Sequence, residues 1–247
     1  MCGEQLVISG LGVFLLVLAV IFISILIRST FGFGNALIAM PLLVLLIGVK
    51  AASPLVALTG SVTSILMLIQ GWQDLQWKET LVLLAASLPG IPLGLFLLNS
   101  VPESIVKSFL GLLLIGFGLY NLLDIRLPSL SHEWLAVPFG LLAGILGGAY
   151  NTNGPPIVIY AVFRGWNKDQ FRASLQGFFL ISSLLIIAGH GITGLWTRET
   201  TFQFLGSIPL IGLAVYLGEK FSTRFPQEIF NKAVYYFLIL AGGLMFL

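Results

Sequence analysis

The sequence predicts an all-α polytopic membrane protein made of two inverted repeats, each opening with a broken or hairpin helix followed by three transmembrane helices. Its composition supports the membrane location: 57% of the 247 residues are hydrophobic, only 9% are charged, and the mean hydropathy is +1.02. A soluble domain carries about 25% charged residues, because its surface faces water. Two glycine-rich breaks and a set of motifs shared by the two halves support the repeats.

Long apolar runs predict that the membrane spans are helices. Val7–Ile27 and Ile105–Leu123 are such runs, and about 20 residues of helix cross the roughly 30 Å hydrocarbon core. A transmembrane barrel would show segments of about ten residues with alternating polarity, which these runs lack. Glu4 precedes the first run and no basic residue does, unlike the start of a signal peptide. We therefore expect the first run to be a retained helix.

Ten helical elements follow one another along the chain, five in each half. The polar stretch DIRLPSLSHE separates the halves, so residues 1–124 are expected to form the first repeat, 125–132 a linker loop, and 133–247 the second repeat of a single membrane domain. The expected elements are Leu6–Ile27, Ala36–Val49, Pro54–Ile69, Thr80–Leu98, Ser104–Leu123, Trp134–Leu146, Pro155–Phe163, Phe171–Ile187, Thr201–Leu217 and Ile229–Phe246.

The two halves share four motifs in the same order. FGFGNALIAMP and LGGAYNTNGPP each place a glycine nine residues before a proline, Gly32 before Pro41 and Gly147 before Pro156. SLP then matches SIP inside the fourth elements, and VPESI matches FPQEI at the start of the fifth. One match says little, since glycine and proline are common in membrane helices. Four matches in one order predict an internal duplication.

The number of elements predicts that the repeats are inverted. If all five elements of a half cross, the second half enters the membrane from the opposite side. Pro155–Phe163 spans only about 14 Å at 1.5 Å per residue, which is too short to cross. A hairpin of the first two elements leaves three crossings per half, which is still an odd number. We favour the hairpin, although Leu6–Ile27 alone is long enough to span.

Lysine and arginine set the expected orientation. One side receives eight of these residues and the other three, with Arg28 at the first break left uncounted. The positive-inside rule places the richer side in the cytoplasm, so both termini are expected outside. The richer set is Lys78, Arg126, Arg164, Lys168, Arg172, Lys220, Arg224 and Lys232, and the other is Lys50, Lys107 and Arg198.

The two breaks predict an anion-binding site. Paired helix breaks in the two halves of a transporter point to its substrate site, and helix N-termini favour anions through free N–H groups and the helix dipole. Glycines let the backbone turn sharply, and asparagines add amide donors without a buried charge. The candidate substrate-binding residues are Gly32, Phe33, Gly34, Asn35, Gly148, Tyr150, Asn151, Thr152 and Asn153, with Arg28 and Gln176 nearby.

Simpler interpretations of these residues stay open at the level of sequence. The asparagines would then only cap helix ends, and the glycines would only pack helices together. Arg28 would be a snorkelling arginine at a helix end rather than a partner for the substrate. His190 would sit partly wet at the membrane interface rather than relay a proton.

The two break motifs and the order of the helices resemble the TauE/SafE sulfite exporter family, also called the four-toluene-sulfonate uptake permeases. The resemblance runs from about Ser24 to Leu247. It implies a secondary transporter of sulfur-containing anions, such as sulfite or organosulfonates, in a bacterial plasma (inner) membrane. It also implies two inverted four-helix repeats, each opening with a hairpin helix. AYNTN replaces the further small apolar residues of many relatives, which points to a difference in substrate.

The acidic residues argue against ion-coupled pumping. All ten fall in termini, loops or helix ends, whereas a proton or sodium pump usually keeps one within the membrane. An anion leaving a cell that is negative inside gains about 2.3 kcal/mol per charge per 100 mV. We therefore expect uniport-like or weakly coupled efflux by alternating access. Transport of another small anion or metabolite is the alternative.

Other classes of function find little support. The sequence contains no HExxH, no GxSxG and no acid pair within an apolar run, so we expect no enzyme. A scaffold would leave the duplicated breaks without a purpose. Two histidines and one cysteine argue against a metal site, and no cofactor is expected. A net charge of +2 gives no reason to expect nucleic acid. The expected partners are a small anion and the lipid bilayer, and a homodimer is left open.

Overall fold

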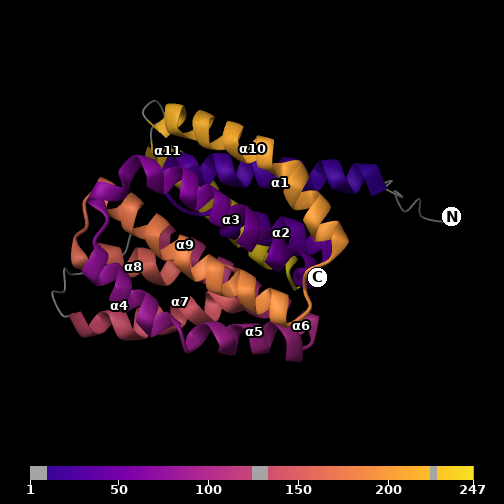
Figure 1. The fold of residues 1–247 in the computed structure, drawn as a ribbon, viewed down its shortest axis with the longest axis horizontal. Coiled ribbons are helices and arrows are strands. Elements are labelled where there is room, and N and C mark those ends of the chain that lie inside the picture. Colours follow the sequence, from indigo (N-terminus) through magenta and orange to yellow (C-terminus); the bar gives the residue numbers. More distant parts are fainter. Residues whose placement is uncertain (1–9, 124–132, 223–226, 247) are drawn as a thin grey trace.

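The computed structural model describes residues 10–123, 133–222 and 227–246, and all regular secondary structure within them is helical (Figure 1). The expected all-α class is confirmed for these residues. The linker at 125–132 and both chain ends lie outside them. The helices are α1 (Gly10–Phe31), α2 (Asn35–Ile47), α3 (Val49–Gly71), η1 (Trp72–Asp74), α4 (Trp77–Ser87), α5 (Gly90–Ser100), α6 (Glu103–Leu122), η2 (Glu133–Leu135), α7 (Ala136–Tyr150), α8 (Gly154–Arg164), α9 (Lys168–Ile192), α10 (Arg198–Ser222) and α11 (Gln227–Leu244).

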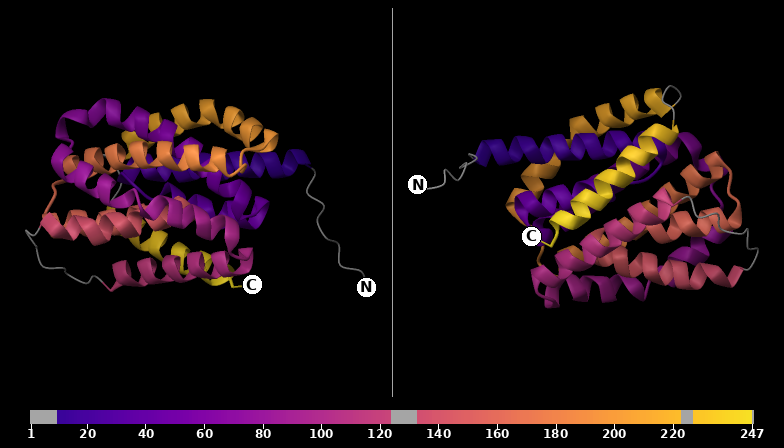
Figure 2. Two further views of the ribbon diagram at one scale, coloured as in Figure 1. Left: turned by 60° about the horizontal axis from the view of Figure 1, so that its bottom comes forward. Right: turned by 180° about the vertical axis from the view of Figure 1, so that it is seen from behind.

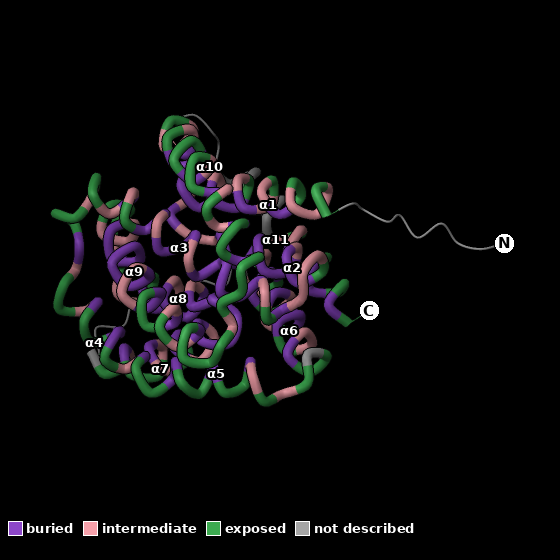
Figure 3. Tube along the Cα trace, turned by 45° about the vertical axis from the view of Figure 1, so that its right-hand side comes forward, coloured by how far each residue is buried: buried purple, intermediate pink, exposed green. Residues whose placement is uncertain are grey.

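Four helices of the described part are long and apolar enough to cross a membrane: α1, α3 together with η1, α9 and α10. A fifth span results if the bent pair of α4 and α5 counts as one. Large apolar side chains lie exposed on the outer faces of these helices, for example Leu15 on α1, Phe96 on α5 and Leu205 on α10. The centre of the molecule is buried (Figure 3). Apolar groups that face outward in such numbers suit a surrounding of lipid.

The expected fourth element, Thr80–Leu98, is wrong as a single helix. The chain bends by 42° between α4 and α5 at Leu88 and Pro89. Pro89 has no N–H to donate, and its ring crowds the carbonyl four residues before it. Its counterpart Pro209 lies inside α10, which continues through it. The same local motif therefore breaks one helix and not the other.

The third element begins earlier than expected. Pro54 was expected to start it, but α3 begins at Val49, directly after Gly48, and carries Pro54 in its second turn. Gly48 has φ of +78°, which only glycine adopts readily, so α2 can turn into α3 through one residue. Burial of Ala52, Ser53 and Leu55 on that turn keeps the helix together despite the missing hydrogen bond.

Helices of the two halves pack against each other in a regular pattern. α1 lies beside α10, α7 lies beside α4 and α5, α3 lies beside α9, and α6 lies beside α11. The pair of α1 and α10 forms one edge of the molecule, and α4, α5 and α7 form the opposite edge (Figure 1). α11 crosses the back, as the right-hand view of Figure 2 shows. Each of these pairs joins helices of different halves.

The directions of these pairs differ in a systematic way. Gly111 of α6 lies against Gly242 of α11, and Gly118 lies against Tyr235, so α6 and α11 run antiparallel. α3 and α9 also run antiparallel, since Ser53 at the start of α3 lies near His190 at the end of α9. Elements in the same position of the two halves therefore point in opposite directions in these two pairs. The inversion of the whole repeats remains a prediction.

Glycines bring α7 into close contact with α4 and α5. A Cβ added to Gly144 would lie 2.3 Å from the carbonyl oxygen of Ser87, and one added to Gly94 would lie 2.2 Å from that of Ile145. Gly148 meets the carbonyl oxygen of Ile91 at 2.3 Å in the same way. Small residues allow such close approach in membrane helices. Gly148, a candidate binding residue, therefore packs α7 against α5.

Candidate functional site

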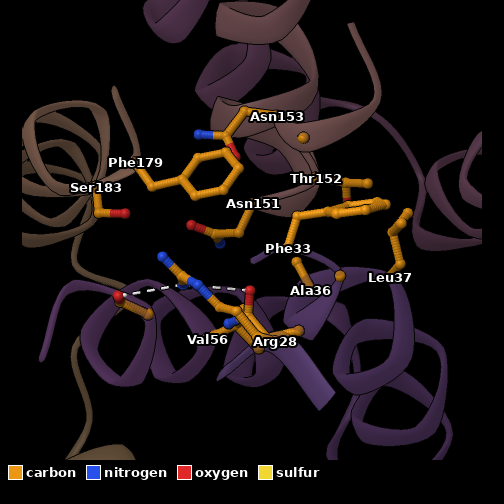
Figure 4. A pocket seen from close by; sticks show the side chains of 14 residues that line it. Arg28, Phe33, Ala36, Leu37, Val56, Asn151, Thr152, Asn153, Phe179 and Ser183 are labelled. Carbon is orange, nitrogen blue, oxygen red and sulfur yellow. Dashed lines mark hydrogen bonds between the residues drawn. The ribbon is translucent and has the colours of Figure 1, made fainter. Parts of the chain in front are cut away.

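The two helix breaks meet at the centre of the molecule. Gly32–Gly34 joins α1 to α2, and Asn151–Asn153 joins α7 to α8. The two helices of each pair pack against one another. Both breaks line one buried cavity of about 30 Å³ (Figure 4), which holds about one or two water molecules. Its lining is Arg28, Phe33, Gly34, Asn35, Ala36, Leu37, Val56, Gly60, Asn151, Thr152, Asn153, Gly154, Phe179 and Ser183.

The backbone of the breaks has the conformation that the motifs predict. Gly32 and Gly34 have φ of +91° and +104°, and Asn151 has φ of +53°. Asparagine is one of the few residues besides glycine that adopts this region without large strain. Neither α2 nor α8 has a side-chain hydrogen bond to its first turn. Asn153 occupies the N-cap position of α8 without a capping bond from its side chain, and Asn151 ends α7 through its backbone N–H. The side chains of the three asparagines, Asn35, Asn151 and Asn153, line the cavity instead.

Arg28 lies deep inside the protein at the end of α1. It is 2% exposed, so the snorkelling interpretation is wrong. Nη1 donates to Asn35 Oδ1 at 3.3 Å and to the Gly60 carbonyl at 3.2 Å, and Nη2 donates to Gln176 Oε1 at 2.6 Å and to Ser64 Oγ. Nε has no hydrogen-bond partner among the described residues. Every partner of this cation is neutral.

The guanidinium of Arg28 points into the cavity. It lies 5.0 Å from the ring centroid of Phe179, within the range of a cation–π contact. In Figure 4 it faces Asn151 and Asn153 across the open space. No carboxylate of the described residues lies within salt-bridge distance of it, and none lines the cavity. An arginine stays protonated in proteins, so the site carries one positive charge without a counter-ion.

Gln176 on α9 does not line the cavity but supports it. Its Nε2 donates to the Gly32 carbonyl at 2.6 Å, and its Oε1 accepts from Arg28. One amide thus fixes both the backbone of the first break and the position of the guanidinium. Gly32 likewise lies behind the cavity surface, and the Cγ of Arg172 packs where its Cβ would be.

The second break is held by serines of neighbouring helices. Nδ2 of Asn151 donates to the Ser53 carbonyl at 2.7 Å and to Ser53 Oγ at 2.8 Å. Nδ2 of Asn153 donates to Ser182 Oγ at 3.0 Å. Neither amide oxygen accepts a hydrogen bond from the described residues. The asparagines therefore present mainly acceptors to the cavity.

His190 lies behind the second break and is fully buried. Its Nε2 is 3.4 Å from Ser53 Oγ, and its Nδ1 has no partner among the described residues. The expectation of a partly wet interfacial ring is wrong. Ser53 connects this histidine to Asn151, but His190 does not line the cavity.

A second hollow opens below the first break. Its volume is about 290 Å³, and Gln176 lines it as well as touching Arg28. Gln176 therefore lies between this hollow, which we call the vestibule, and Arg28 in the cavity. The ionisable residues of the vestibule are Asp74, Asp169, Arg172 and Glu219.

The sequence predicted one part of the cavity lining but not another. Phe33, Gly34, Asn35, Asn151, Thr152 and Asn153 face the cavity together with Arg28, whereas Gly32, Gly148, Tyr150 and Gln176 do not. Tyr150 is buried in the hydrophobic core. Phe179 and Ser183 were missed. They follow Gln176 at helical spacing on one face of α9, and this spacing could have indicated that they lie near the site.

The described residues contain no group of three or more histidine, cysteine, aspartate or glutamate side chains arranged to hold a metal ion. The arginine and the helix starts around the cavity are chemistry for an anion.

Comparison with known proteins agrees with this chemistry. Residues 16–245 match the family described as Sulfite exporter TauE/SafE. The chain is also 21% identical over 179 residues to a protein of Cupriavidus necator named "Probable sulfite/organosulfonate exporter TauE", covering 71% of this chain and 70% of that protein. No solved structure matches the chain.

Proposed function

Because the chain belongs to the sulfite exporter TauE/SafE family, we propose that this integral membrane protein is a secondary transporter of small sulfur-containing anions, sulfite or an organosulfonate. The substrate binds in the cavity where the two helix breaks meet. The transport is efflux by alternating access through a bacterial inner membrane, with both chain ends outside.

One observation supports the site above all others, namely the buried charge of Arg28. An ionised side chain inside a membrane protein is costly and marks a functional position. Here the charge has only neutral hydrogen-bond partners and one unused N–H, and it faces a cavity. A bound anion would satisfy Nε and compensate the charge. In the empty protein, neutral amide and carbonyl oxygens keep the guanidinium in position for the anion.

Two sets of hydrogen bonds tie the two breaks to helices of the opposite halves, which supports alternating access. The first break is tied to α9 by Gln176, and by Arg172, whose Nη2 donates to the Ser29 carbonyl at 2.9 Å. The second break is tied to α3 by the hydrogen bonds of Asn151 to Ser53. Each break thus docks on the third helix of the other half. Opening one contact at a time would expose the site to one side only.

The charges around the site favour transport without a coupling ion. No carboxylate lines the cavity, so no acidic residue there can take up a proton or sodium ion. The membrane potential alone drives an anion out of the cell with about 2.3 kcal/mol per charge per 100 mV.

The first experiment measures sulfite flux in proteoliposomes under an imposed potential, for the wild type and Asn153→Ala. Asn153 faces the cavity and is held by Ser182. Removing a hydrogen bond that binds or orients the substrate costs about 1 kcal/mol, so we expect the flux to fall five- to tenfold. Asn99→Ala, on the distant end of α5, is the matched control, since Asn99 bonds only the Leu95 carbonyl. Equal fluxes in both variants and the wild type would mean that the second break has no part in transport.

A further inference from the structure

We propose that the cavity selects the singly charged form of an oxyanion, so that sulfite is carried as bisulfite together with its own proton. This inference rests on the proposed function and names the species that the same site accepts. Its consequence is that a fully ionised dianion, such as sulfate or sulfite itself, is excluded.

The charge of the cavity favours a monoanion. Of the residues that line it, Arg28 alone is ionised, and all others are neutral. One monoanion therefore makes the occupied site neutral. A dianion would leave one unpaired negative charge in a buried site, which costs far more free energy than the same charge in water.

The hydrogen bonding of the two asparagines of the second break favours a protonated oxyanion. The Nδ2 groups of Asn151 and Asn153 donate to Ser53 and Ser182, while both Oδ1 atoms are left to face the cavity. An amide oxygen accepts hydrogen bonds and repels a bare anionic oxygen. A protonated oxyanion can donate its O–H to one of these acceptors. Its remaining oxygens can then accept from the unused Nε–H of Arg28.

The charge of the vestibule disfavours a dianion. It contains three carboxylates, Asp74, Asp169 and Glu219, and one arginine, Arg172. Its net charge is therefore negative. The repulsion of an approaching anion scales with the charge of that anion, so a dianion is repelled twice as strongly as a monoanion.

The ionisable groups around Arg28 determine how a pH experiment must be controlled. Beyond Gln176, which accepts from Arg28, the vestibule contains Arg172 and Asp169 from α9, Asp74 from η1 and Glu219 from α10. On the far side lies His190, at the end of α9. α2 brings no ionisable residue to the cavity, and neither do the parts of α3 and α8 that line it. Histidine alone among these groups has an ordinary pKa near neutrality, so a histidine variant tests whether the protein titrates.

The experiment compares sulfite with methanesulfonate over a mildly acidic to mildly alkaline range, with equal pH on both sides of the vesicles and a fixed potential. Methanesulfonate keeps one charge throughout, whereas sulfite changes from monoanion to dianion. We expect methanesulfonate flux to stay constant within about twofold. Sulfite flux should fall by about tenfold per pH unit once the dianion dominates, following the monoanion fraction. Sulfate in excess should not inhibit either flux. Vesicles without protein correct for sulfur dioxide, which crosses lipid in acid.

Three outcomes would overturn the inference. If sulfite flux is flat or rises with pH, or if sulfate inhibits it, a dianion enters the site. A parallel fall of both fluxes that His190→Gln abolishes means that the protein, and not the substrate, titrates. If neither anion moves at any pH in wild-type protein, while a folded state is verified by thermal unfolding, the proposed function itself fails. That result differs from the first two, in which transport is intact but the species is wrong.

Discussion

Replacing Arg28 with glutamine is expected to lower sulfite flux about 100-fold while the protein remains folded. Hydrogen bonds between charged groups are worth about 1.5–3 kcal/mol each, and every 1.4 kcal/mol is a factor of ten. Glutamine can keep a contact to Gln176 or Ser64 but has no charge for the anion. Initial rates of flux in proteoliposomes, at sulfite concentrations well below saturation, measure the effect.

Two controls distinguish the role of the charge from that of the fold. Arg28→Lys keeps the charge but loses the planar fork of donors, so we expect a smaller loss of about tenfold. Arg198→Gln makes the same change at an exposed position at the start of α10 and should transport normally. Sulfite should raise the unfolding temperature of the wild type, because a ligand stabilises the state that binds it, and should not raise that of Arg28→Gln. Full transport by Arg28→Gln would remove the basis for the site.

Gly144→Ala is expected to lower the unfolding temperature by about 5–10 °C, the largest effect on stability that we foresee from adding one methyl group. Its Cβ would lie 2.3 Å from the Ser87 carbonyl oxygen, where backbone of α4 leaves no room. Forcing an extra carbon into a packed interface costs about 1–3 kcal/mol, and about 1 kcal/mol corresponds to 2–4 °C in a protein of this size. Thermal unfolding in detergent measures the shift.

The matched control is Gly212→Ala on α10. No atom lies within 4 Å of the Cβ that this change adds, and alanine is the better helix former by about 1 kcal/mol. We therefore expect an unchanged or slightly higher unfolding temperature. A Gly144→Ala protein as stable as the wild type would show that α4, α5 and α7 can separate at little cost, which the close packing contradicts.

The helical fold could be predicted because hydropathy and the glycine and proline motifs are local signals. Both breaks lie within the stretches that the motifs predicted, at Gly32–Gly34 and Asn151–Asn153, but they are shorter than expected, because α1 and α7 continue to Phe31 and Tyr150. The break at Pro89 and the continuous helix through Pro209 could not be distinguished from the sequence, since both prolines occur in nearly the same motif. The difference lies in their surroundings. α5 turns to follow α7, whereas α10 continues along α1 and α3.

The candidate site was predictable only where its residues belong to the breaks. Arg28 stood beside a motif, but its partners Ser64 and Gln176 are 36 and 148 residues away in sequence. Spacing along the chain therefore could not show that the cation is buried. Gly148 was chosen because it lies in the motif, and its true role depends on Ile91 of another helix. A glycine that turns and a glycine that packs look alike in sequence.

The exchange of partners between the halves also has a consequence for synthesis. α1 emerges from the ribosome long before α10, the helix that lies along it. Until then, Arg28 lacks Gln176 and the first break lacks its support. We therefore expect the first half to stay incompletely packed until α9 and α10 are made, and two fragments cut in the linker to become stable only when they are produced together.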